Sequence, residues 1–313
     1  MHLATGQLTK GCAAMFSSSV TRRRVAFAFV LPAFVLLLAI SIYPLLRTLG
    51  LAFSSLELTV SPAESFVGFD NFAKAFQDVR FWNAMGNTLV LVIVGVAIQL
   101  VLGVGLALLL SEIGFTRVVW LTALLLPVMI APVVSGFQFR VIYNDTFGPL
   151  NYLIKTISGG FVTGPPWLAD TRTALLTIMM TDVWQWTPFM MLLALAGLES
   201  IPVELTEAAE VDGAGYWGAF WRIKIPILLP VIVIGLLIRV MDTFKTFDLV
   251  FLLTGGGPGS STETIAFYTY LNGFRFFSMG YTAAIAFIQL IVIIVIARIF
   301  LVVQKRMRGG EIQ

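Results

Sequence analysis

Four charged residues recur at steps of three inside an apolar segment of this 313-residue chain: Arg239, Asp242, Lys245 and Asp248. Neighbours in the row alternate in sign, so each can form an ion pair with the residue three positions along a helix. Each step turns about 300°, which places Arg239 and Asp248 on opposite faces of that helix. Charges at this depth are costly in lipid. We therefore expect them inside a helical bundle, in a water-filled cavity or at a subunit interface, with a proton relay as the alternative.

A second polar group interrupts another apolar segment, where two tryptophans stand beside a carboxylate and an amide. Such polar groups inside a membrane helix should face a cavity or a partner chain. Sugars present apolar C–H faces ringed by hydroxyls, and tryptophan rings beside polar side chains match that surface. The alternative for each tryptophan is an anchor in the outer leaflet. Together with the charged row, this group predicts a substrate pathway that includes Asp182, Trp184, Gln185, Trp186, Asp242, Lys245 and Asp248.

The residue inventory argues against enzymatic chemistry. His2 is the single histidine and Cys12 the single cysteine, so we expect no internal disulfide, no His- or Cys-based metal site and no catalytic pair. The glycine-rich segment at 254–260 lacks the lysine of a phosphate-binding loop. We therefore expect no catalytic residue, no metal and no cofactor on this chain. If ATP drives its function, ATP and magnesium must be bound by a second polypeptide.

The most polar long segment, at 198–226, separates two apolar segments. Three glutamates recur at i, i+3 and i+6 along a short helix, and two adjacent alanines let another surface approach closely. Gly213 should end this helix with a positive φ, and the Asp212 side chain should hold the turn by bonding backbone amides. An aromatic helix and a proline follow. The residues expected to carry the contacts of this bent loop are Glu204, Glu207, Ala208, Ala209, Asp212, Gly213, Ile223 and Pro226.

Composition and apolar segments predict a membrane protein. Hydrophobic residues make up 58% of the chain and charged residues 12%, whereas about a quarter of a soluble domain is charged. In lipid the backbone must satisfy its own hydrogen bonds, so apolar segments of about 20 residues form helices. The fold class is therefore an all-α polytopic membrane protein with six transmembrane helices, and two prolines should kink the third. The expected spans lie near 25–46, 85–110, 118–141, 173–197, 227–252 and 282–304.

Positive charge predicts the orientation in the membrane. Three arginines at 22–24 precede the first apolar segment and should stay in the cytoplasm. The segment is long, lacks a clear cleavage site and is followed by five more, so we interpret it as an uncleaved anchor. Six spans leave both tails, 1–24 and 305–313, and the loop at 198–226 on the cytoplasmic side of a transmembrane domain at 25–304. The net charge of +3 then reflects topology, and no nucleic acid partner is expected.

The polar loop also carries a family motif. The letters E-A-A-x-x-D-G-A at 207–214, with Ile223 and Pro226 downstream, resemble the EAA loop of permease subunits of binding-protein-dependent ABC importers. Shorter stretches, such as G-F-D-N-F at 68–72 and the glycine-rich segment at 254–260, resemble the maltose-type carbohydrate branch. The resemblance covers nearly all of residues 25–304. It implies the type I importer permease architecture and a place in the bacterial inner membrane.

The resemblance also implies partners and a mechanism. Two ATPase subunits would bind ATP-Mg and receive the loop, a second, similar permease would complete the pore, and an extracytoplasmic binding protein would deliver sugar. ATP-driven closure of the ATPases would rock the lipid-embedded helices between outward and inward access. Import of another solute, such as a polyol, glycerol phosphate or an amino acid, is an alternative. So are an ion-coupled transporter that uses Asp242 and Asp248, and a membrane-bound enzyme or scaffold.

Overall fold

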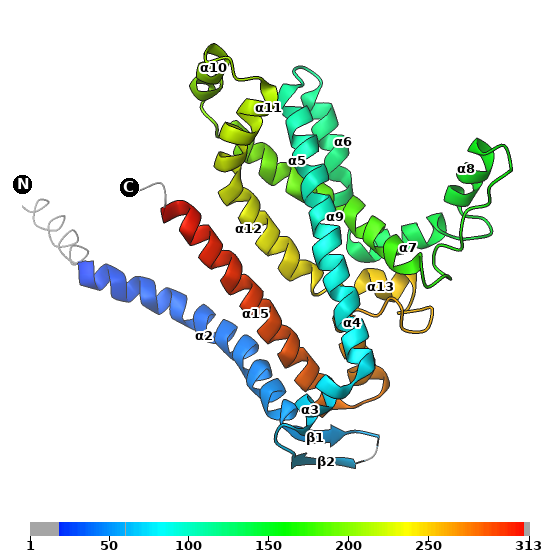
Figure 1. The fold of residues 1–313 in the computed structure, drawn as a ribbon. Coiled ribbons are helices and arrows are strands. Elements are labelled where there is room, and N and C mark those ends of the chain that lie inside the picture. The colour runs from blue at the N-terminus through cyan, green and yellow to red at the C-terminus, as the bar shows by residue number, and fades with distance from the viewer. Residues whose placement is uncertain (1–18, 60, 310–313) are drawn as a thin grey trace, which may run out of the picture.

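The computed structural model of the chain describes residues 19–59 and 61–309, so parts of both predicted tails, with His2 and Cys12, lie outside it. The described residues form a bundle of long helices with one small hairpin (Figure 1). Four helices are long and apolar enough to cross a membrane, at 27–52, 79–112, 216–243 and 279–307. Two bent helix pairs, at 117–142 and 174–211, pass the same criterion, which gives up to six spans in the described residues.

The first and last long helices, α2 (Ser19–Ala52) and α15 (Met279–Gly309), meet only near the hairpin end of the molecule (Figure 1). Ala52 packs there against Ala283 and Ala284, whose small side chains allow close approach. From this contact α2 diverges from the other helices, and its most apolar window is 0% buried. Most of its surface must therefore face lipid or another chain.

The second span is one continuous helix made of α4 (Val79–Val90), the π-helical turn η1 (Leu91–Gly95) and α5 (Val96–Glu112). Its α5 part packs along α9 (Ala174–Glu199). At Gly103 an added Cβ would lie 2.7 Å from Cβ of Met190, so glycine is what allows the two helices to approach this closely. This contact fixes α5 and α9 relative to each other, and both carry residues of the site described below.

The third span is broken rather than kinked. Helix α6 (Arg117–Met129) and helix α7 (Pro132–Ile142) meet at an angle of 95°. Ile130 and Ala131 between them are extended, with ψ of 131° and 139°. Pro132 favours this conformation because a proline disfavours the helical region for the residue before it. Pro132 therefore helps to form a corner in the expected 118–141 segment, whereas Pro127 lies within α6. Helix α8 (Pro149–Ile157) lies beyond the corner, at the side of the bundle (Figure 1).

The fifth expected span, at 227–252, is divided. Helix α12 (Ile225–Thr243) ends in a turn, and the short helix α13 (Asp248–Leu253) begins after it. The helical steps of three hold from Arg239 to Lys245, where ion pairs join Arg239 to Asp242 and Asp242 to Lys245. They do not extend to Asp248, because the backbone leaves the helix first. The prediction that Arg239 and Asp248 occupy opposite faces of one helix is therefore wrong.

The two ends of the bundle differ (Figure 1). At one end lie α10 (Val203–Val211), α11 (Tyr216–Ala219) and the π turn η2 (Phe220–Lys224), which leads into α12. At the other end the antiparallel strands β1 (Ser54–Glu57) and β2 (Ser61–Phe66) form a hairpin that the sequence did not predict. The same end of the bundle also contains α3 (Asp70–Gln77), α14 (Ile265–Tyr270) and η3 (Leu271–Arg275).

Candidate transport pathway and coupling loop

A buried guanidinium joins three helices in the middle of the bundle. Arg239 of α12 is 1% exposed, and its Nε donates to Oε1 of Gln99 on α5 at 2.9 Å. Its Nη2 donates to Oδ2 of Asp182 on α9 at 3.0 Å, and its Nη1 to Oδ2 of Asp242 at 3.0 Å. A charge this deep is tolerated because every guanidinium nitrogen has an acceptor. Substituting either buried partner on the other helices, Gln99 or Asp182, should therefore disturb the packing of α5, α9 and α12 together.

Gln99 completes the network, and sequence reasoning missed it. Its Nε2 donates to Oδ2 of Asp182 at 2.7 Å, so one amide bonds both members of the ion pair. Gln99 is fully buried. The Trp186 ring lies against the guanidinium, with Cζ of Arg239 4.5 Å from the ring centroid. A lone amide in an otherwise apolar segment was the available signal, because a polar side chain in a membrane helix faces a partner.

A polar cavity of about 190 Å³ lies beside this network, between α9 and the turn that separates α12 from α13. Non-helical backbone at membrane depth is tolerated where it borders such a cavity or protein. Asp242 lies roughly 25 Å along α12 from Ile225, at 1.5 Å per residue. Six of the seven predicted pathway residues line the cavity. Its lining comprises Pro132, Asp182, Gln185, Trp186, Asp242, Lys245, Thr246, Phe247, Asp248 and Leu249.

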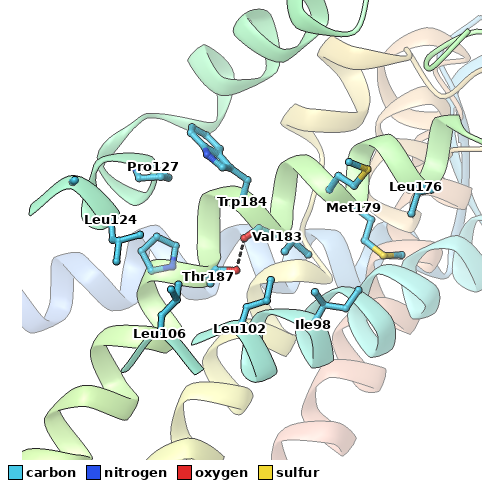
Figure 2. Close-up of a pocket in the computed structure, with 13 residues that line it drawn as sticks. Ile98, Leu102, Leu106, Leu124, Pro127, Leu176, Met179, Val183, Trp184 and Thr187 are labelled. Atoms are coloured by element: carbon cyan, nitrogen blue, oxygen red, sulfur yellow. Dashed lines mark hydrogen bonds between the residues drawn. The ribbon is translucent and has the colours of Figure 1, made fainter. Parts of the chain in front are cut away.

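Trp184 is the seventh predicted pathway residue, and it faces a different cavity. Its ring packs edge-on against Phe139, with centroids 4.9 Å apart. It lines an apolar groove of about 590 Å³ between α5, α6 and α9, together with residues such as Leu102, Leu124 and Pro127 (Figure 2). Trp184 and Trp186 are two positions apart on α9, a rotation of about 200°, so they cannot point into one cavity.

Gln185 connects the polar cavity to the corner of the third span. Its Nε2 donates to the Ile130 carbonyl at 2.8 Å, which satisfies a backbone oxygen left free by the break between α6 and α7. Gln185 is 1% exposed, and its Oε1 has no hydrogen-bond partner among the described residues. An unpaired buried acceptor costs free energy. The side chain thus holds the corner, and its Oε1 is an unpaired buried acceptor beside the cavity.

The predicted coupling loop forms a knob, defined here as residues 200–224, which turns away from the bundle. Helix α10 bends by 72° from α9. Gly213 follows with φ of 76°, and the backbone N–H groups of Gly213 and Ala214 donate to Glu210 and Ala209 at 3.0 and 2.9 Å. This is the pairing of a Schellman turn. The predicted glycine stop is confirmed.

Two details of the knob correct the sequence interpretation. Among the described residues, the Asp212 carboxylate has no hydrogen-bond partner, so backbone groups rather than this side chain close the turn. Ala209 is 7% exposed and faces the interior of the knob, so only Ala208 offers a small side chain to another surface. Glu204, Glu207, Gly213 and Pro226 are exposed, and Ile223 is partly buried.

The exposed surface of the knob is also apolar. Val211 is 87% exposed, Trp217 66% and Trp221 63%, whereas Phe220 packs inward. Large apolar side chains gathered in this way, beside carboxylates, are typical of a protein–protein contact.

In residues 19–59 and 61–309, no three His, Cys, Asp or Glu side chains gather in a way that could hold a metal ion.

Residues 119–309, which include the cavity and the knob, match the family described as "Binding-protein-dependent transport system inner membrane component". The chain belongs to this family of ABC importer permeases. The resemblance drawn from the 207–214 motif is confirmed.

Curated relatives match over almost the whole permease. The sulfoquinovosyl glycerol permease SmoG of Agrobacterium fabrum is 34% identical, over 89% of this chain and 90% of that protein. The trehalose/maltose permease MalF of Thermococcus litoralis is 30% identical, over 90% and 94%. The trehalose permease SugA of Mycobacterium tuberculosis is 33% identical, over 91% and 90%.

A solved structure confirms the fold. A bacterial ABC transporter for the acidic polysaccharide alginate matches with a TM-score of 0.80 and 24% identity, over 92% of this permease and 97% of that chain. The predicted all-α architecture of an importer permease is therefore confirmed for this membrane-embedded transport subunit.

Proposed function

We propose that this permease forms half of the pathway of an ATP-driven sugar importer, with a second, homologous permease forming the other half. One observation carries the proposal: the same two helices border the polar cavity and enter the knob. Helix α9 bears Asp182, Gln185 and Trp186 and ends at Glu199, next to the knob. Helix α12 begins at the exit of the knob and bears Asp242. Movement of the knob would therefore shift both walls of the cavity.

The knob is the proposed contact with the ATPase subunits. Glu204, Glu207 and Ala208 lie exposed on α10, and Trp217 and Trp221 lie exposed on the segment after it. Two ATPase subunits would bind ATP-Mg and receive one knob from each permease, and this chain would bind no cofactor itself. ATP-driven closure of the two subunits would push the knobs, so that the cavity opens alternately to the two sides.

The proposed orientation places the knob and both termini in the cytoplasm of a bacterial cell, across the inner membrane. The hairpin end lies at the opposite end of the bundle (Figure 1). The extracytoplasmic sugar-binding protein would dock there, and lipid would cover the outward surface of the long helices. This assignment agrees with the arginines at 22–24 and with Lys305 and Arg306 at the far end of α15.

The proposed solute is a sugar. Relatives named for trehalose, maltose and sulfoquinovosyl glycerol support this class. The cavity itself offers carboxylates, an amide oxygen and the Trp186 ring, which suit the hydroxyls and apolar faces of a sugar. An amino acid would need a site for its carboxylate. Among the described residues, the Arg239 guanidinium beside the cavity has all three of its nitrogens bonded, and the Lys245 ammonium is paired with Asp242.

Substitution at Gly213 tests the coupling role. Its φ of 76° strains any other residue by about 1 kcal/mol or more. An added Cβ meets nothing within 4 Å inside the chain, so a larger side chain should clash with a partner protein rather than with this chain. We expect Gly213→Asp, and likewise Ala208→Trp, to reach the membrane but to lose copurifying ATPase or sugar-stimulated hydrolysis.

Gly114→Asp is the matched control, because it adds the same charge on the same proposed side, at a position without a positive φ and with nothing within 4 Å. It should retain the ATPase and the stimulation by binding protein and sugar. If Gly213→Asp behaves like this control in copurification, hydrolysis and uptake, the knob is not the coupling element.

A further inference from the structure

The polar cavity contains several hydrogen-bond acceptors that lack a full set of donors. Oε1 of Gln185 is buried and unpartnered among the described residues. The Asp248 carboxylate also lines the cavity, and within residues 19–59 and 61–309 it has neither a hydrogen bond nor an ion pair. Oδ1 of Asp242 has only Lys245, whose Nζ lies 3.7 Å away. A ligand that satisfies these oxygens must bring donors, such as hydroxyl groups.

Of the two cations near the cavity, Arg239 is committed to protein partners and Lys245 is exposed. Arg239 uses Nε, Nη1 and Nη2 on Gln99, Asp242 and Asp182, and Trp186 covers one face of its guanidinium. Bidentate recognition of a carboxylate or phosphate uses a guanidinium with two free parallel N–H groups, whereas a lysine attracts an anion as a point charge. Lys245 remains, but its side chain is 64% exposed and Asp242 is its ion-pair partner. An anionic ligand would therefore find no free guanidinium here.

The balance of charge points the same way. Three carboxylates, on Asp182, Asp242 and Asp248, stand against two cations, on Arg239 and Lys245, which leaves a formal charge of −1. Since Asp248 is the unpaired member, the excess negative charge lies at the cavity itself. A carboxylate, sulfonate or phosphate on the solute would therefore meet a like charge on Asp248, which repels it.

We infer that this permease admits uncharged polyhydroxy solutes, such as neutral oligosaccharides, and discriminates against anionic sugars and sugar phosphates. The inference rests on the proposed sugar-import function and narrows it. It separates this permease from relatives named for acidic cargo, the sulfonated SmoG solute and alginate, and it disfavours glycerol phosphate. Asp248 and Gln185 are the proposed specificity residues, with Asp248 rejecting anions and Gln185 accepting a hydroxyl.

The test measures binding to the complete transporter in nanodiscs by equilibrium dialysis. The probes are radiolabelled neutral disaccharides of several linkages, including trehalose and maltose, each paired with the counterpart in which one glucose is glucuronate. We expect at least one neutral disaccharide to bind at least tenfold more tightly than its uronate. Asp248→Asn, which keeps the shape of the side chain and removes the unpaired charge, should narrow that ratio at least threefold by improving uronate binding.

Asp145→Asn is the control, because it removes an exposed carboxylate from the loop before α8, away from this cavity. It should leave the ratio unchanged. Equal or tighter binding of the uronate, or an Asp248→Asn ratio like that of Asp145→Asn, overturns this inference and leaves sugar import standing. If the transporter binds neither the neutral disaccharide nor its uronate in any of the pairs, the proposed sugar function and this inference are both overturned.

Discussion

Replacing Asp182 by leucine leaves the Arg239 guanidinium buried without its nearest buried counter-charge. The two side chains are 7% and 1% exposed. Removing one member of such a pair costs about 3–5 kcal/mol in soluble proteins, because the remaining charge stays desolvated. Asp242 still accepts from Nη1, but its side chain is 43% exposed and compensates only in part. Unfolded membrane helices retain some polar partners, so we expect a loss of about 2–3 kcal/mol in the free energy of unfolding.

The assay is unfolding of the purified permease in mixed micelles by titration with sodium dodecyl sulfate, followed by circular dichroism. Asp242→Leu is the matched control, since it removes a carboxylate from the same guanidinium at a partly exposed site, where about 1 kcal/mol or less is expected. The double variant Asp182→Leu with Arg239→Met should recover at least about 1 kcal/mol relative to additivity. Equal costs for Asp182→Leu and Asp242→Leu, or strict additivity in the double variant, would refute the network as a buried unit.

Two further predictions concern the tryptophans and the hairpin end. Of the two tryptophans, only Trp186 faces the polar cavity, so Trp186→Ala should impair sugar uptake while basal ATPase activity persists. Trp184→Ala should reduce uptake far less. Equal losses of labelled-sugar uptake in the two variants would contradict this assignment. Burial by itself would raise the pKa of Asp78, but hydrogen bonds from Tyr268, Tyr281 and two backbone amides outweigh it and hold the pKa below the ordinary 3.8. The stabilisation from Asp78 is therefore present above pH 3.8 and is lost as the pH falls through the lowered pKa of the folded protein. Asp78→Asn should therefore lose less stability between pH 7 and pH 3 than the unmodified permease does. Unfolding in micelles at the two pH values measures this difference.

Much of the site could be predicted from local pattern. Alternating charge at steps of three predicts the ion pair of Arg239 with Asp242 on α12 and that of Asp242 with Lys245 in the turn that follows, because helical spacing brings those positions together. The position of Gly213 after a helical segment predicts its positive φ. The cost of burying charge in lipid places Asp182 and Arg239 inside the bundle, where the structure pairs them.

What the sequence did not reveal depends on tertiary contacts or on where helices break. Gln99 carries no charge, and its role exists only because α5 lies against α9 and α12. The turn after Thr243 carries no proline, so the charged row looked like one helix. Ala208 and Ala209 are adjacent residues of the same type, and only the packing of the knob determines which of the two is exposed. The different directions of Trp184 and Trp186 follow from helix geometry alone and could have been foreseen.

Uptake by proteoliposomes tests most directly whether this chain serves ATP-driven sugar import. The vesicles contain this permease, its partner permease and the ATPase, with binding protein and a labelled neutral disaccharide outside. We predict that internal ATP supports uptake when proton and sodium gradients are collapsed, and that Gly213→Asp abolishes it. Uptake that persists without ATP and collapses with the ion gradient would contradict the account and favour ion coupling through Asp242 and Asp248.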